Sequence, residues 1–263
     1  MKNLDSIRST SIKYSQGRQE KLPALAVNTC TGNETVLLIQ DNPSWYYYGF
    51  NSMNEELQAQ GVNFCTISSD QIGSVNLSRF KEIIIPSAQY QPYYSNIMPN
   101  GAILPSIEAF VRNGGILSAN LAWAESSAAG ATFVGGLKYQ ESYTDDNNIA
   151  NSSHPIITAA LPCFGGNCGQ ILDQGYRNDL DGWNSSSHGY FTNLPTGTGV
   201  ILTDENNNPV MIEYPYGKGM VVVTFSTVEF QYGLGEKKLL ANELAYQSYL
   251  VRRGSRGLLV EVE

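Results

Sequence analysis

Polar side chains that could bind a ligand or take part in catalysis follow three apolar runs of the sequence. A carboxylate and several amides gathered in one place could bind the hydroxyl groups of a sugar or another polyol. The alternative is that Asp41 and Asn42 only close a turn, which is a common use of these residue types. The candidates after the runs that begin at Val36, Ile83 and Ile116 are Asp41, Asn42, Ser87, Gln89, Asn120 and Trp123.

Aromatic residues crowd next to two of these positions. The stretch "NPSWYYYGF" (Asn42–Phe50) has four adjacent aromatic residues beginning at Trp45, and "YQPYYSN" (Tyr90–Asn96) adds three tyrosines. Aromatic rings stack on sugar rings and anchor protein interfaces. We predict that both stretches are loops at one end of a sheet and that some of their rings are exposed to a ligand. In the alternative interpretation, the rings pack on each other or on the irregular insertion of residues 124–198.

A histidine and a glutamate support a catalytic alternative. His188 lies in "WNSSSHGYF", and together with Asp41 or Glu229 it could serve a hydrolase that acts on a sugar or an ester. No G-x-S-x-G elbow is present and the serine run is typical of a loop, so a structural or crevice-lining role is favoured. We assign no catalytic residue and expect no cofactor. The acidic stretches "DLDGWN" (Asp179–Asn184) and "YTDDNN" (Tyr143–Asn148) match calcium loops only in part, so no metal ligand is assigned.

The elements that must position these residues alternate between strands and helices over the first half of the chain. The expected strands are 36–42, 62–68, 83–89 and 116–122, and the expected helical segments are 52–61, "LSRFKE" and 104–115. This order predicts a mostly parallel, flavodoxin-like α/β sheet flanked by helices. Since ligands bind outside the carboxyl ends of such strands, we expect the candidate side chains to line one crevice.

The second half of the chain is less regular. Residues 124–198 are rich in Gly, Asn, Ser and Asp and predict an irregular insertion with one strand at Leu137–Tyr143. Residues 199–226 predict three antiparallel strands, and the amphipathic pattern of Glu236–Leu250 predicts a helix that packs on the sheet. The whole is expected to form one α/β domain over 35–250 with a C-terminal antiparallel extension, between a flexible lead-in (1–34) and a tail (251–263).

Several of these segments resemble the class I glutamine amidotransferase-like superfamily, and more narrowly its ThuA-like and non-catalytic branches. The resemblance rests on "RNGGILSANLA", on "HPI" after the insertion and on "PVMIEYPYGKGMVVVTFS", and it extends from Val36 to Leu250. It implies an elbow after the fourth strand, where amidotransferases have a cysteine and the ThuA-like branch has a histidine. Here that position is Asn120, and Glu229 follows the last strand without a histidine. The resemblance therefore implies a scaffold that lacks the groups for glutamine hydrolysis.

The charge and hydropathy of the chain exclude two classes of partner. The net charge is −8 and no basic stripe is visible, so we expect no nucleic-acid binding. No apolar run of about eighteen residues occurs, so we expect no membrane insertion.

Four cysteines bear on the compartment. Cys163 and Cys168 flank a short flexible loop that could close as a disulfide, and a second bridge between Cys30 and Cys65 is conceivable. The alternative is four free thiols. The low charge content and the abundance of Asn, Ser, Thr and Tyr favour an extracellular or cell-surface protein. The first twenty residues do not form a signal peptide, so the alternatives are a cytoplasmic protein or part of a longer secreted precursor.

These observations lead to three functional hypotheses. The first is a catalytically inactive amidotransferase-like module that binds carbohydrate or protein, with Asp41, Asn42, Trp45, Gln89, Asn120, Trp123, His188 and Glu229 as candidate ligand-binding residues. The second is the hydrolase described above. The third is a scaffold or oligomerisation domain, in which the tyrosine-rich stretches form the interface.

Overall fold

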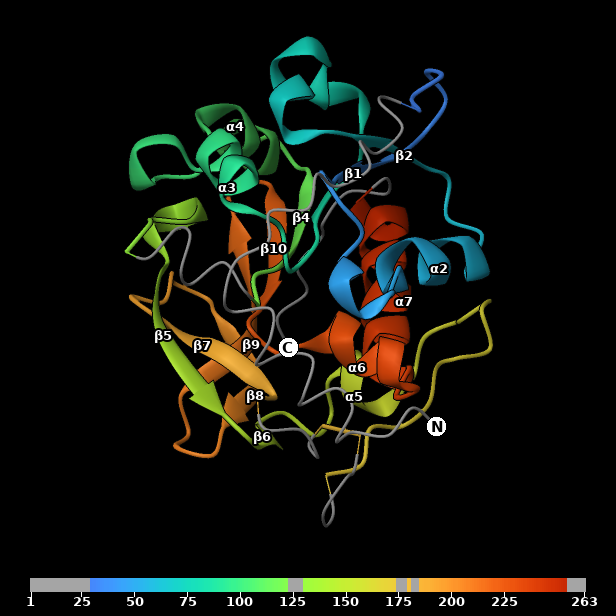
Figure 1. Ribbon diagram of the computed structural model, residues 1–263, viewed down its shortest axis with the longest axis vertical. Helices are drawn as coiled ribbons and strands as arrows, with labels where there is room; N and C mark the ends of the chain where they lie inside the picture. Colours follow the sequence, from blue (N-terminus) through green and yellow to red (C-terminus); the bar gives the residue numbers. More distant parts are fainter. Residues whose placement is uncertain (1–28, 123–129, 174–178, 181–184, 255–263) are drawn as a thin grey trace.

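An eight-stranded sheet runs through the centre of the molecule and has helices on both faces (Figure 1). The computed structural model describes residues 29–122, 130–173, 179–180 and 185–254. The sheet order is β2-β1-β3-β4-β10-β9-β8-β6. In that order the strands are Phe64–Ile67, Val36–Ile39, Glu82–Ile85, Ile116–Asn120, Gly219–Thr224, Pro209–Tyr216, Gly199–Asp204 and Asn147–Ile149.

The first five strands of this order are parallel and the last three continue the sheet in antiparallel pairs. The parallel part has the strand order of flavodoxin-like sheets, 2-1-3-4-5, with β10 as the fifth strand. A separate antiparallel pair, β5 (Lys138–Thr144) and β7 (Ser187–Thr192), comes from the insertion. The predicted α/β fold, with its parallel sheet and C-terminal antiparallel strands, is confirmed.

Alternating side chains of the strands build a core on each face of the sheet. Leu37, Ile39 and Ile83 point to one face, while Val36, Leu38 and Ile84 point to the other. This alternation explains why these strands are apolar throughout, since a parallel strand is buried on both sides.

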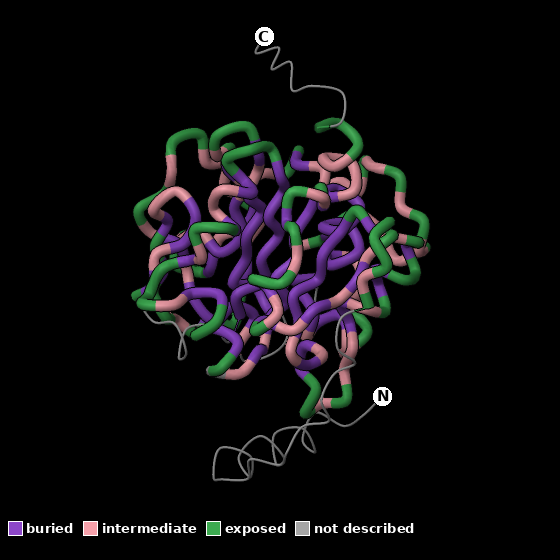
Figure 2. The backbone as a smooth tube through the Cα atoms, turned by 90° about the horizontal axis from the view of Figure 1, so that it is seen from above, coloured by how far each residue is buried: buried purple, intermediate pink, exposed green. Residues whose placement is uncertain are grey.

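On the first face lie α3 (Gln91–Ile97), α4 (Pro105–Arg112) and the 3₁₀ turns η2 (Ser69–Ser74), η3 (Leu77–Arg79), η4 (Pro99–Gly101) and η5 (Val134–Gly136). On the second face lie α2 (Ser52–Ala59), α5 (Pro155–Thr158), α6 (Val228–Leu234) and α7 (Lys238–Gly254). Figure 2 shows the buried strands as the interior of the molecule.

One expectation about the tyrosine-rich stretches is wrong. The segment after β3 is not an exposed loop, because residues 91–97 form helix α3 with a proline in its first turn. Tyr93 and Tyr94 are buried in the core, and the Tyr93 hydroxyl donates a hydrogen bond to the Ile39 carbonyl at 2.8 Å. The hydroxyl groups of these tyrosines made the stretch resemble a polar loop. Their apolar rings instead fill the space between the helix and the sheet.

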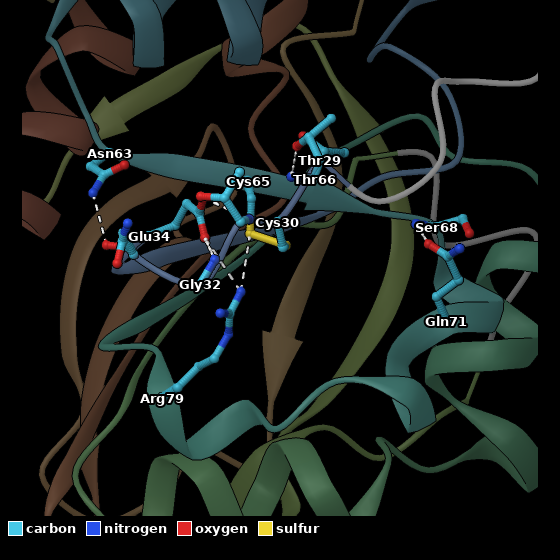
Figure 3. The surroundings of a disulfide bond; sticks show 12 residues. Thr29, Cys30, Gly32, Glu34, Asn63, Cys65, Thr66, Ser68, Gln71 and Arg79 are labelled. Atoms are coloured by element: carbon cyan, nitrogen blue, oxygen red, sulfur yellow. Dashed lines mark hydrogen bonds and ion pairs between the residues drawn. A yellow bond between two sulfur atoms is a disulfide. The ribbon is translucent and has the colours of Figure 1, made fainter.

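Two boundaries also differ from the expected ones. Helix α7 continues past Leu250 to Gly254, into the segment expected to be a tail. At the other end, the described part of the lead-in is attached to the edge strand β2. The Thr29 amide donates to the Thr66 carbonyl at 3.0 Å, and Cys30 forms a disulfide with Cys65 (Figure 3).

The second pair of cysteines also forms a disulfide, between Cys163 and Cys168. The loop that it closes is held against the helices of the second face. The Asn167 amide donates to the Glu56 carboxylate at 2.6 Å, and the Gly169 amide donates to the Asn242 side chain at 3.2 Å. None of the helices in the described part of the chain has the length and apolar content that a membrane crossing needs.

Candidate functional site

Glu229 is the centre of the polar cluster at the carboxyl end of the parallel strands. It lies in the first turn of α6 and is fully buried. Its carboxyl accepts hydrogen bonds from the Ser44 hydroxyl at 3.0 Å, from the Ser87 backbone amide at 3.0 Å and from the Ser87 hydroxyl. Burial raises the pKa of Glu229 to about 8, against the opposing effect of these hydrogen bonds. Glu229 therefore joins the loops after β1 and β3 to helix α6 as a largely protonated acid at neutral pH.

Trp45 completes this connection between the two loops. Its indole Nε1 donates to the Ser87 hydroxyl oxygen at 3.0 Å, and its ring packs on Phe230 at 5.0 Å between centroids. Trp45 is only 6% exposed, so it is not an open stacking surface. Trp45 (φ 57°) and Ala88 (φ 54°) both have left-handed backbone conformations, which cost non-glycine residues energy. The surrounding hydrogen bonds and ring contacts hold the two loops in these conformations.

The polar residues predicted after β1 and β3 come together, but most of their polar atoms bond to neighbouring backbone and side chains. The Asp41 carboxylate accepts from the Ser69 amide at 2.6 Å and from the Ser69 hydroxyl at 2.8 Å. The Gln89 side chain accepts from the amides of Asp41 and Asn42, and it donates to the Asn42 and Ser87 carbonyls. The Asn42 amide donates to the Pro43 and Ala88 carbonyls. These three side chains thus brace the loops of the expected crevice.

Asn120 ends β4 beneath α7, where it faces a second buried acid. Glu243 is 1% exposed and lies beside Gln247, whose amide donates to the Glu243 carboxyl at 3.0 Å and to the Ser118 hydroxyl. Burial raises the pKa of Glu243 to about 8, opposed by Gln247, Ser118 and Asn120. The Asn120 amide is close enough to lower the pKa of both Glu243 and Glu229, yet neither of its polar atoms makes a hydrogen bond of ordinary geometry.

His188 lies on β7 and is buried among aromatic rings. Its ring contacts Trp45 edge-on at 5.7 Å and Tyr143 at 4.9 Å between centroids. Trp45 therefore contacts His188 on one side and Ser87 on the other, while the Asp41 carboxylate is engaged by Ser69. Trp123, the remaining predicted site residue, lies outside the described residues.

Four exposed or half-buried tyrosines lie near this buried cluster, because two follow Trp45 directly, one packs on Tyr47 and one packs on His188. We use the name tyrosine rim for Tyr46, Tyr47, Tyr90 and Tyr143. Tyr46 and Tyr47 belong to the 3₁₀ turn η1 (Tyr46–Tyr48), and Tyr47 packs edge-on against Tyr90 at 5.7 Å. Tyr47 is 46% exposed and Tyr143 is 54% exposed. The expectation that some rings of the first aromatic stretch are exposed is confirmed, while Tyr143 was not singled out because its strand lies in the irregular insertion.

Of the two acidic stretches that match calcium loops in part, Tyr143–Asn148 is described in full, and Asp179–Asn184 is described only at Asp179 and Leu180. Asp179 accepts from Lys238 at 2.9 Å and from the Leu172 amide at 2.7 Å, so a cation of the protein already neutralises it. Among the described residues, the carboxylate and thiol side chains close enough to share a metal ion are Cys30, Glu34 and Cys65. The disulfide uses both of these thiols, which removes the thiolate ligands that a metal would need.

Comparisons with known proteins give distant similarities. No family model matches the sequence. An uncharacterized protein of Clostridium acetobutylicum is 28% identical over 217 residues, which are 81% of this chain and 20% of that protein. The chain thus spans about a fifth of the length of this curated relative.

The solved structures with a similar fold are also distant in sequence. A cytoplasmic protein of Salmonella typhimurium is 17% identical, with a TM-score of 0.48 over 81% of this chain and 98% of that one. A candidate GMP synthase component from Thermoplasma acidophilum is 11% identical, with a TM-score of 0.48 over 85% and 94%. A cold-adapted β-galactosidase of Rahnella sp. R3 is 17% identical, with a TM-score of 0.48 over 82% of this chain and 31% of that one. At these identities the description of the fold rests on the strand order of this chain, and the description of the site rests on its own contacts.

Proposed function

We propose that this chain is a non-catalytic, amidotransferase-like binding module whose tyrosine rim binds carbohydrate. The observation that carries the proposal is the buried cluster near the rim. Glu229, Ser87 and Trp45 bond to one another and are buried, so these polar groups are not accessible to a substrate. Near them, exposed tyrosines offer the surface of their rings. Such amphipathic rings suit a sugar, which has apolar C–H faces and hydroxyl edges.

The position of the rim supports the same proposal. In open α/β sheets the binding crevice lies beyond the carboxyl ends of the strands, and η1 follows β1 at this edge. Hydrogen bonds to Glu229 and Gln89 hold the loops near the rim. A rim on a braced loop loses little conformational entropy when a ligand binds, which favours affinity.

We further infer that the protein works in an oxidising compartment, at or outside the cell surface. Both cysteine pairs form disulfides, and such bonds persist in secreted and surface proteins while they are rare in the cytosol. Mass spectrometry of the protein isolated from its natural source tests this point. Two intact disulfides support the inference, and four free thiols contradict it in favour of the cytoplasmic alternative.

A glycan array followed by calorimetric titration tests the binding proposal. Tyr47→Ala and Tyr143→Ala should each weaken the binding of a sugar hit about tenfold, the loss typical of a central aromatic contact. Phe164→Ala is the matched control, because Phe164 is 73% exposed but lies on the Cys163–Cys168 loop beside α2. An equal loss in all three variants, or no sugar hit with a well-folded protein, contradicts the proposal.

A further inference from the structure

A pocket of about 260 Å³ opens at the opposite edge of the sheet, where β3, β4 and β10 begin. Glu82, Ile116 and Met220 lie side by side in register across these three strands. The residues just before them therefore meet at one edge. The pocket is bounded on its other side by Tyr246 and the last turns of α7.

Three cationic side chains from three different elements line this pocket. Lys81 precedes β3, Lys218 lies in the turn before β10, and Arg253 lies in the last turn of α7. All three are exposed, and none of the ion pairs between described residues includes any of them. The edge thus presents an unneutralised positive field around a concave surface.

The backbone holds one of these cations in place. Lys218 follows Gly217, whose φ of +61° is suited to glycine, and the Lys218 amide donates to the Arg112 carbonyl at 3.0 Å. A Cβ on Gly219 would lie 2.2 Å from the Val111 and Gly115 carbonyl oxygens, so this turn packs directly on the chain around α4. The backbone of Lys218 is therefore fixed at the edge of the pocket.

The interior of the pocket combines apolar walls with one carboxylate that is already engaged. Ile116, Met220 and Leu250 contribute apolar surface. Glu213 accepts a hydrogen bond from the Tyr246 hydroxyl at 2.5 Å and lies 3.4 Å from His154 Nε2. Burial opposes the ionisation of Glu213, but these two partners lower its pKa. The carboxylate charge is therefore engaged by His154 and Tyr246.

We propose that this pocket binds a small phosphomonoester, with the phosphate between Lys81, Lys218 and Arg253 and an apolar body against Ile116 and Met220. A dianion with three terminal oxygens can accept from two ammonium groups and one guanidinium at once. A body of a few carbon atoms matches both the size of the pocket and its apolar walls. The site lies away from the tyrosine rim and does not depend on the carbohydrate proposal.

Titration of the full chain with phenyl phosphate tests this proposal, with inorganic phosphate and phenol as the two part-ligands. Phenyl phosphate should bind at one saturable site and more tightly than either part alone. Lys218→Met and Arg253→Met should each weaken binding about threefold to tenfold, as expected for the loss of one charge-assisted contact at a partly exposed site. Both residues are exposed, so circular dichroism should show the same fold in the variants as in the parent.

Lys138→Met is the matched control, because Lys138 is an exposed lysine on β5, outside the pocket lining. It should leave the affinity for phenyl phosphate unchanged. An equal loss in Lys138→Met would show that binding reflects only the overall charge and would overturn the proposal. Absence of saturable binding in the parent protein, or tighter binding of benzoate than of phenyl phosphate, would overturn it as well.

Discussion

Three of the buried glutamates have raised pKa values, which is the most unusual residue-level property of the protein. Glu82, Glu229 and Glu243 are at most 2% exposed, and none forms an ion pair with a cation among the described residues. Burial raises the pKa of each to about 8, and repulsion by Glu243 adds to the shifts of Glu82 and Glu229. A carboxyl that stays protonated at neutral pH can donate a hydrogen bond, which suits a bracing role.

These shifts predict a loss of stability as the pH rises. The folded-state pKa lies above the unfolded value of 4.5, so the folded protein holds more protons between these two values. The stabilisation is complete below about pH 4.5 and is lost as the pH rises through about 8. Each of the three ionisations should lower the free energy of unfolding in urea by on the order of 3 kcal/mol between pH 6 and pH 9.

Substitution of one acid by its neutral isostere separates this effect from other titrations. Glu243→Gln should reduce the fall between pH 6 and pH 9, because it removes one of the ionisations. Glu236→Gln removes an exposed carboxylate just before α7 and should leave the pH dependence as in the parent. The same pH dependence in Glu243→Gln as in the parent would mean that Glu243 is already ionised at neutral pH.

Substitution of Ser87 tests whether its hydroxyl, through hydrogen bonds with Glu229 and Trp45, stabilises the loops after β1 and β3. Ser87→Ala removes its hydrogen bonds with Glu229 and with Trp45, and it leaves two buried polar groups short of a partner. The free energy of unfolding should fall by about 1–3 kcal/mol, the usual cost of such orphaned groups. Ser78→Ala removes an exposed hydroxyl on η3 that bonds to Asn76, and in urea denaturation it should change stability little. Equal losses of stability in Ser87→Ala and Ser78→Ala would show that the Ser87 hydrogen bonds do not stabilise these loops.

At the scale of elements, the two disulfides constrain loops of very different length. Cys30 and Cys65 are 35 residues apart and fix the segment before β1 to the edge strand β2, whereas Cys163 and Cys168 are 5 residues apart. Arg79 lies 3.4 Å from the Glu34 carboxylate and 3.9 Å from the Cys65 sulfur, so the longer bridge is also surrounded by polar contacts (Figure 3).

Loop entropy predicts the order of their contributions to stability. In the chain-entropy description, loss of the longer bridge costs about 4 kcal/mol and loss of the shorter one about 2 kcal/mol. Guanidinium denaturation of Cys30→Ser/Cys65→Ser and of Cys163→Ser/Cys168→Ser measures both values. A larger loss from the second pair would show that the native contacts of its loop, such as the Asn167–Glu56 hydrogen bond, outweigh the chain entropy.

The elements with a clear sequence period were predictable, and those whose identity depends on tertiary contacts were not. The short apolar run at Val36, stopped by turn residues, is typical of a buried strand, and the spacing of apolar residues from Glu236 is typical of an amphipathic helix. The helix at Gln91 was missed, because tyrosine carries a hydroxyl group and its position in the core depends on tertiary packing. The two core tyrosines are buried only because α3 covers the sheet. The continuation of α7 to Gly254 was missed as well, because Arg252, Arg253 and Gly254 are exposed and add no apolar residue to the helical pattern.

At the scale of the whole molecule, the strand order brings distant side chains together at both edges of the sheet. Asp41, Gln89 and Asn120 were expected to meet at the carboxyl edge, because parallel strands end there. Glu229 was among the candidates, because it follows the last parallel strand. Glu243 was not named, since it lies on α7, 125 residues from the Ser118 side chain that it contacts. The cationic pocket was not predicted either, because its three cations are far apart in the chain and meet only through the strand order and the end of α7.

We propose that the carboxyl edge of the sheet binds a sugar without transforming it. Saturation-transfer NMR of a glycan hit, followed over a day with the protein present, measures binding and turnover in the same tube. We expect saturation of the sugar protons, loss of that signal in Tyr47→Ala, and no new product resonances. Product resonances that disappear in Glu229→Gln or in a His188→Ala variant would contradict the account, because they would show that the buried cluster opens and does chemistry.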